Sequence, residues 1–133
     1  MSEALGPYKV RPPVMSVQVE DSMDVMIIHD TTRHVTSLLG FPPIARAQLA
    51  GAASALSELV LKTGELHTVH ITGIEHHNRI GAQLSTEAKW LAGQPVKNIV
   101  AGLRSKLGNL IDEVIIDEDA GPAIIIILWN PDN

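Results

Sequence analysis

The chain has 133 residues, enough for one domain, and its net charge of −5 argues against a nucleic acid as the direct partner. The 10 basic residues form no run, and the aromatic content of 3% is too low to build stacking platforms for single strands. The absence of cysteine, of an apolar signal segment near the start and of any apolar run approaching the roughly 20 residues of a membrane helix predicts a cytoplasmic protein without a membrane segment.

The first half of the chain predicts a strand followed by two helices. Residues 1–13 contain glycine and several prolines, which indicates a flexible or extended lead-in. Apolar residues alternate over 14–20, as is typical of a strand. Apolar residues recur at helical spacing over 24–39, and a second, alanine-rich helix is expected over 42–64, beginning at two prolines.

The second half predicts four more strands and one helix. In chain order these elements are a strand over 66–75, its hairpin partner over 79–86, a helix over 95–112, and strands over 114–117 and 123–129. Four consecutive isoleucines in the last strand would be buried on both faces, so we expect this strand to be central in the sheet. The order predicts an α+β fold over residues 14–133, a two-layer sandwich with about three helices on one face of a mixed, mostly antiparallel sheet.

Two apolar residues of the first predicted helix lie off its core stripe. Met26 and Ile27 either widen the buried face or form a second apolar surface for a partner. Asp30 and Arg33 add polar groups to the same helix. The candidate partner interface therefore consists of Met26, Ile27, Asp30 and Arg33.

Six histidines and an acidic stretch are candidate metal ligands, but their spacing in the sequence argues against a metal site. His67 and His70 are three residues apart on a predicted strand, so we expect their side chains to face opposite sides. The acidic residues of 112–119 lack the alternating oxygen ligands and central glycine of an EF-hand. We therefore expect surface histidines, a solvated acidic rim and no metal.

Several short motifs follow one another in a particular order. Leu39-Gly40-Phe41 ends the first predicted helix, Ser54-Ala55-Leu56 lies in the second, residues 110–113 (LIDE) end the third, and residues 120–122 (AGP) precede the last strand. In this order, over residues 24–129, the chain resembles the histidine-kinase-like (GHKL, or Bergerat-fold) ATPases, most closely the small bacterial switch-protein serine kinases and anti-sigma factors. The resemblance implies a Bergerat-like fold with a nucleotide cleft.

The same resemblance implies that the ATP-handling residues have been replaced. The family carries a Glu and an Asn four residues apart for proton transfer and for Mg²⁺, and these positions match Ala55 and Leu59. Its adenine-reading Asp matches Thr86, and its two loop glycines match Ala88 and Trp90. The closing G-x-G-T motif is shortened. The implied vestigial cleft, without cofactor, consists of Ala55, Leu59, Thr86, Ala88, Trp90 and Gly121.

A domain without nucleotide chemistry is expected to act through its surfaces. The resemblance implies a non-catalytic regulatory domain in a partner-switching, stress or sigma-factor pathway, binding a sigma factor, a STAS-domain protein, a PP2C-type phosphatase or a second copy of itself. The alternative is a divergent ATP- and Mg²⁺-dependent serine/threonine kinase of the anti-sigma type, in which a register shift makes Glu58 the base. Otherwise Glu58 and Lys62 are expected to form an exposed ion pair. A third alternative is a small structural domain whose sheet is convergent.

Overall fold

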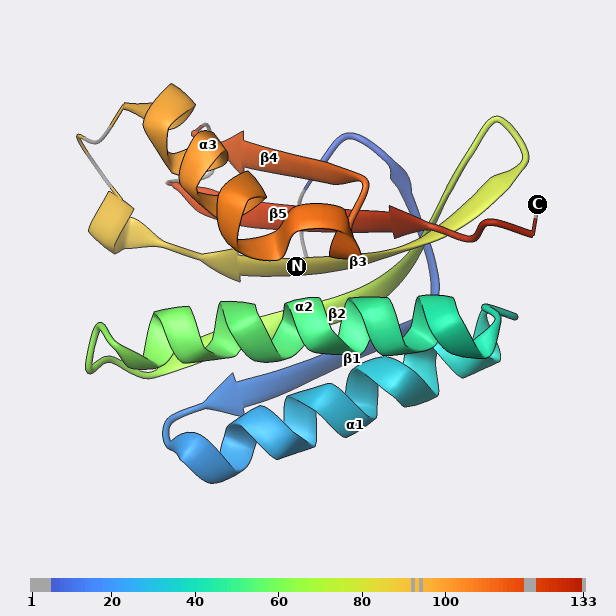
Figure 1. Ribbon diagram of the computed structural model, residues 1–133, viewed down its shortest axis with the longest axis horizontal. Helices are drawn as coiled ribbons and strands as arrows, with labels where there is room; N and C mark the ends of the chain where they lie inside the picture. The colour runs from blue at the N-terminus through green and yellow to red at the C-terminus, as the bar shows by residue number, and fades with distance from the viewer. Residues whose placement is uncertain (1–5, 92, 94, 119–121, 133) are drawn as a thin grey trace.

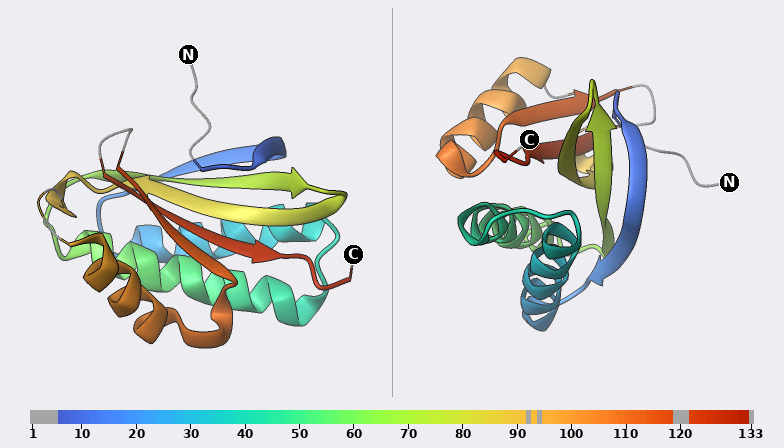
Figure 2. Two further views of the ribbon diagram at one scale, coloured as in Figure 1. Left: turned by 90° about the horizontal axis from the view of Figure 1, so that it is seen from above. Right: turned by 90° about the vertical axis from the view of Figure 1, so that its right-hand side faces the viewer.

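Five strands form one sheet, and the helices lie together against one of its faces (Figures 1 and 2). The computed structural model describes residues 6–91, 93, 95–118 and 122–132. The elements are β1 (Lys9–Val19), α1 (Ser22–Leu38), α2 (Pro43–Leu61), β2 (His67–His76), β3 (Arg79–Glu87), the short 3-10 turn η1 (Lys89–Leu91), α3 (Val96–Leu107), the 3-10 turn η2 (Gly108–Leu110), β4 (Glu113–Asp117) and β5 (Ala123–Trp129).

The strand order is β1-β2-β3-β5-β4, and the described strands pair antiparallel throughout. The α+β two-layer architecture expected from the sequence is confirmed. The expectation of a mixed sheet is wrong for the described strands, because each strand pair runs in opposite directions. None of the helices in the described part of the chain has both the length and the apolar character needed to cross a membrane.

The isoleucine strand β5 occupies an interior position, between β3 and β4. All seven of its residues are buried. Ile124 and Ile126 pack into the core beneath the helices, whereas Ile125 and Ile127 belong to a second apolar cluster on the other face. The prediction that this strand is buried on both faces is confirmed.

The helical layer is built from one capped helix and one helix rich in small residues. A capping box starts α1: the Asp21 carboxylate accepts the Met23 N–H at 2.9 Å, and the Asp24 carboxylate accepts the Asp21 N–H at 3.2 Å. The predicted stripe of α1 faces the core, with Ile28 and Val35 fully buried. Four alanines of α2 are buried as well (Ala45, Ala50, Ala52 and Ala53), and small side chains on this helix allow α1 to pack closely beside it.

Two predicted boundaries differ from the structure. The lead-in was expected to reach residue 13, but β1 already begins at Lys9, and its register against β2 shifts between Arg11 and Val14. The two prolines sit at this irregularity on an edge strand, where a missing N–H is tolerated. The third helix was expected to reach residue 112, but α3 ends at Leu107, because Gly108 takes a left-handed φ of 54° and caps it.

The segment before β1 lies against the sheet face that the helices leave open. The Tyr8 ring meets the Trp129 indole edge-on, with ring centroids 5.0 Å apart. The Tyr8 hydroxyl donates to Oε1 of Glu113 at 2.8 Å, and Trp129 Nε1 donates to Oε2 of the same carboxylate at 2.7 Å. Gly6 sits so close to the sheet that a β-carbon there would lie 2.9 Å from Oε1 of Gln83. Sequence reasoning missed this contact.

The titration of Tyr8 tests this contact. The hydrogen bond to Glu113 raises the pKa of the Tyr8 phenol above 10.0, burial and the Glu113 charge act in the same direction, and Arg79 opposes them. A raised pKa means that this contact stabilises the fold below the unfolded pKa of about 10, and that the stabilisation is lost as the pH rises through the folded pKa.

Because the chain contains one tyrosine, phenolate absorbance reports Tyr8 alone. We expect the titration midpoint of the native protein to lie above that of the unfolded chain, and Glu113→Gln to lower it. Glu118→Gln, an exposed carboxylate beyond the end of β4, serves as the control. Identical midpoints in the wild type and Glu113→Gln would contradict the contact.

Candidate functional site

An apolar groove of about 200 Å³ lies between α2, α3 and η1, with β5 at its base. Leu59 of α2 forms one wall, and Ile99 and Leu103 of α3 form the other. The exposed side chains of Asn98 and Lys106 supply its polar groups. Its full lining is Leu59, Trp90, Leu91, Asn98, Ile99, Gly102, Leu103, Lys106 and Ile124.

Two of the residues matched to the nucleotide cleft meet in this groove. Leu59 and Trp90, which are distant in sequence, line it together. Ala55 is half-buried and packs against the main core, and Thr86 and Ala88 are fully buried. The last cleft residue, Gly121, lies outside the described residues.

The polar groups of Thr86 and Ala88 are engaged within the protein. The Thr86 hydroxyl donates to the carbonyl of Thr68 at 3.0 Å. The Ala88 N–H donates to the carbonyl of Pro122 at 2.7 Å, which joins the end of β3 to the start of β5. A buried donor with an internal acceptor has no bond left to offer a ligand. Neither group therefore has a proton left to donate to adenine or phosphate in this arrangement.

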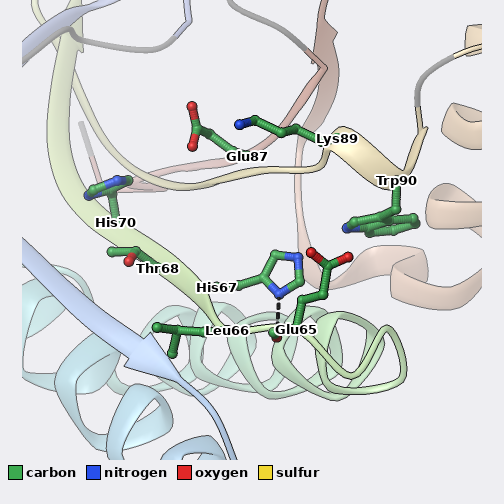
Figure 3. Close-up of a pocket in the computed structure, with 8 residues that line it drawn as sticks. All are labelled: Glu65, Leu66, His67, Thr68, His70, Glu87, Lys89 and Trp90. Carbon is green, nitrogen blue, oxygen red and sulfur yellow. Dashed lines mark hydrogen bonds between the residues drawn. The ribbon is translucent and has the colours of Figure 1, made fainter.

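A second, polar hollow of about 270 Å³ shares Trp90 with the groove (Figure 3). It lies where β2 begins and β3 ends, and it is lined by Glu65, Leu66, His67, Thr68, His70, Glu87, Lys89 and Trp90. Sequence reasoning missed it, because its residues come from two strand ends that only the hairpin pairing brings together. Charged residues on both sides of the predicted hairpin, Glu65 and Glu87, were the available signal.

Two histidines of β2 line this hollow. His67 and His70, which were expected to face opposite sides of a strand, both border the hollow at the beginning of that strand (Figure 3). His67 is the first residue of β2, and its Nδ1 lies 2.9 Å from the carbonyl of Glu65. His70 Nδ1 lies 2.8 Å from Oγ of Ser16. In the part of the chain that the structure describes, no three His, Asp or Glu side chains are placed to hold a metal.

The proposed alternative base, Glu58, lies on the exposed side of α2. It lines neither the groove nor the polar hollow, and Lys62 is exposed one turn later. The ion pairs that join described residues within 4.0 Å are Lys9–Glu75 and His29–Asp30. The expected pair between Glu58 and Lys62 is therefore absent.

Apolar side chains are exposed along the outer face of α1. Met23, Met26 and Ile27 are 74%, 71% and 50% exposed, so the alternative that Met26 and Ile27 widen the buried stripe is wrong. Asp30 and Arg33 are exposed further along the helix. We call these five residues the α1 surface. Met23 was missed, although its spacing of three and four residues from the other two places it on the same side of the helix.

In comparisons with known proteins, no family model matches the chain, and no curated protein sequence matches it. We therefore infer function from the groove, the polar hollow and the α1 surface.

The two tryptophans allow a matched test of the groove. Trp129 donates its indole N–H to Glu113, whereas the buried Nε1 of Trp90 has no hydrogen-bond partner among the described residues. A hydrogen bond to a charged group contributes about 1.5–3 kcal/mol, whereas an unpaired buried donor costs about 1–3 kcal/mol. We expect Trp129→Phe to lower the free energy of unfolding by about 1–3 kcal/mol more than Trp90→Phe does. Denaturant unfolding followed by circular dichroism measures both, and equal losses would contradict this description of Trp90.

Proposed function

We propose that this protein is a non-catalytic regulatory domain that binds another protein, and that it is a degenerate relative of the histidine-kinase-like ATPases. Its place would be a cytoplasmic partner-switching, stress or sigma-factor signalling pathway. One observation carries the proposal: mainly apolar side chains, and no carboxylate, line the groove in which the resemblance implies nucleotide chemistry. The exposed α1 surface supplies an alternative means of acting.

The groove supports the loss of chemistry through its composition and size. Phosphoryl transfer needs oxygen ligands for Mg²⁺ and donors for the phosphates. No carboxylate lines the groove to hold Mg²⁺, and Leu59 has no polar group at the position that the resemblance assigns to a metal ligand. The donors that line it are the indole N–H of Trp90 and the side chains of Asn98 and Lys106, and the nearby Ala88 N–H already has an acceptor. Small-molecule sites usually enclose about 300–1,000 Å³. The groove of about 200 Å³ falls below this range.

The α1 surface supports protein binding through its side chains. Methionine is enriched in the cores of protein interfaces, because its flexible, polarisable side chain adapts to a partner. Met23 and Met26 are the two most exposed apolar members of this surface. Asp30 and Arg33 carry opposite charges and can form its polar rim. By the resemblance, the partner is a sigma factor, a STAS-domain protein or a PP2C-type phosphatase.

Charged substitutions on α1 test the proposal. The double variant Met26→Glu/Ile27→Glu should weaken capture of such a partner from the native host at least about tenfold, because two carboxylates would have to be desolvated at the contact. Ile44→Glu is the matched control, since Ile44 is 78% exposed at the start of α2, outside the α1 surface. Capture of none of the three partner classes, or equal capture by both variants, would contradict the proposal.

A phosphoryl-transfer assay distinguishes the kinase alternative from the proposed function. The wild type and Glu58→Ala are incubated with labelled ATP, Mg²⁺ and a STAS-domain protein. We expect no transfer of label, because Glu58 lies outside the groove and the polar hollow. Transfer that Glu58→Ala abolishes would replace the proposed function with a kinase.

A further inference from the structure

Over residues 14–19 the outer edge of β1 is unprotected, whereas the part of β1 before it carries Lys9, two prolines and a shift in register. In the described sheet β1 pairs only with β2 and lies at the margin (Figure 1), so the backbone groups on its other side have no strand partner there. Residues 14–19 (VMSVQV) contain no charge and no proline. Proteins usually block such an edge with lysine, proline, a bulge or a covering segment, because a free edge pairs with other chains.

The opposite edge of the sheet is protected by its shortness and by charge. β4 has five residues, against eleven in β1, and it begins with Glu113 and ends with Asp117. On β1, the apolar side chains of Val14 and Met15 are 55% and 41% exposed. The contrast between β4 and residues 14–19 indicates that this part of β1 has an occupant.

We infer that the occupant is β1 of a second copy of this chain, paired antiparallel about a two-fold axis that passes through residues 14–18. The charges at the two ends of the strand favour this partner. Lys9 and Arg11 make the first end basic, and Glu20 and Asp21 make the other end acidic. Antiparallel self-pairing places each basic end beside the acidic end of the other copy, whereas parallel pairing would place like charges together.

The antiparallel pairing also determines on which side of the joined sheet the helices of each copy lie. Residues directly opposite each other in an antiparallel pair point to the same side of the sheet. If the two-fold axis is perpendicular to the sheet, the two five-stranded sheets join into one of ten strands, with both helical layers on the same side. The assembly then carries two α1 surfaces on that side. The pairing itself uses β1 and does not rest on the proposed function.

Single cysteines locate the axis directly. The chain contains no cysteine, so each introduced thiol is unique. A residue on a two-fold axis lies opposite its own copy, with β-carbons about 4.5–5.5 Å apart, close enough for a disulfide after small adjustment. We expect mild oxidation of single-cysteine variants at positions 14–18 to give disulfide-linked dimers with a maximum at one position and lower yields on either side. Ser37→Cys and Ser105→Cys are exposed controls away from β1.

Positive charges introduced on the β1 edge test the same pairing in solution. Light scattering should give twice the chain mass for the wild type, and the chain mass for Val14→Lys/Gln18→Lys, which places lysines of the two copies beside each other. Leu38→Lys/Ile44→Lys adds the same charge at two exposed apolar positions off the edge and should stay dimeric. All four residues are exposed, and unchanged circular dichroism establishes that the variants fold.

Three results would overturn the inference. They are a wild-type monomer at every concentration measured, equal dissociation of the two lysine variants, and cross-linking at Ser37 or Ser105 as strong as at positions 14–18. None of them bears on capture of a partner through the α1 surface.

Discussion

The structure depends on the burial of both faces of β5. Four consecutive isoleucines gain about 1.5–3 kcal/mol each when they leave water, and they can do so only if both faces of the strand are covered. The helices cover Ile124 and Ile126, and the second cluster around Trp129 holds Ile125 and Ile127. Burial of the open face explains why the segment before β1 lies against the sheet instead of extending into solvent. Burial of the other face explains why α3 lies above β5, where it forms one wall of the groove.

Much of the fold could be predicted because burial imposes a period on the sequence. The limits of β5 follow from its uninterrupted apolar run. The start of the hairpin return at Arg79 follows from a turn in which His77 and Asn78 both take positive φ. The start of β1 could not be predicted, because prolines indicate the end of a strand unless that strand is known to lie at the edge of a sheet. The end of α3 was missed because apolar spacing continues through Ile111, which packs into the core from beyond Gly108.

The candidate site could be predicted only in part, for a similar reason. Leu59 and Trp90, which the resemblance matches to one cleft, both line the groove, whereas Ala55, Thr86 and Ala88 of the same match do not. The polar hollow could not be predicted, because it depends on which strand ends the hairpin brings together. The sequence alone could not decide whether Met26 and Ile27 are exposed or belong to a wider buried face of the helix. The position of α1 against β1 had to be known first. A mainly apolar groove and exposed apolar side chains on α1 and β1 are the features on which the proposed function rests.

The proposed function requires that the groove, lined mainly by apolar side chains, does not bind a nucleotide. Isothermal titration calorimetry of the full chain with ATP and Mg²⁺ measures such binding. We expect no saturable heat up to millimolar ATP, because neither Leu59 nor Trp90 can coordinate the metal and the Ala88 N–H is already bonded. Saturable binding with micromolar affinity would show that the nucleotide site is functional and would contradict the proposal.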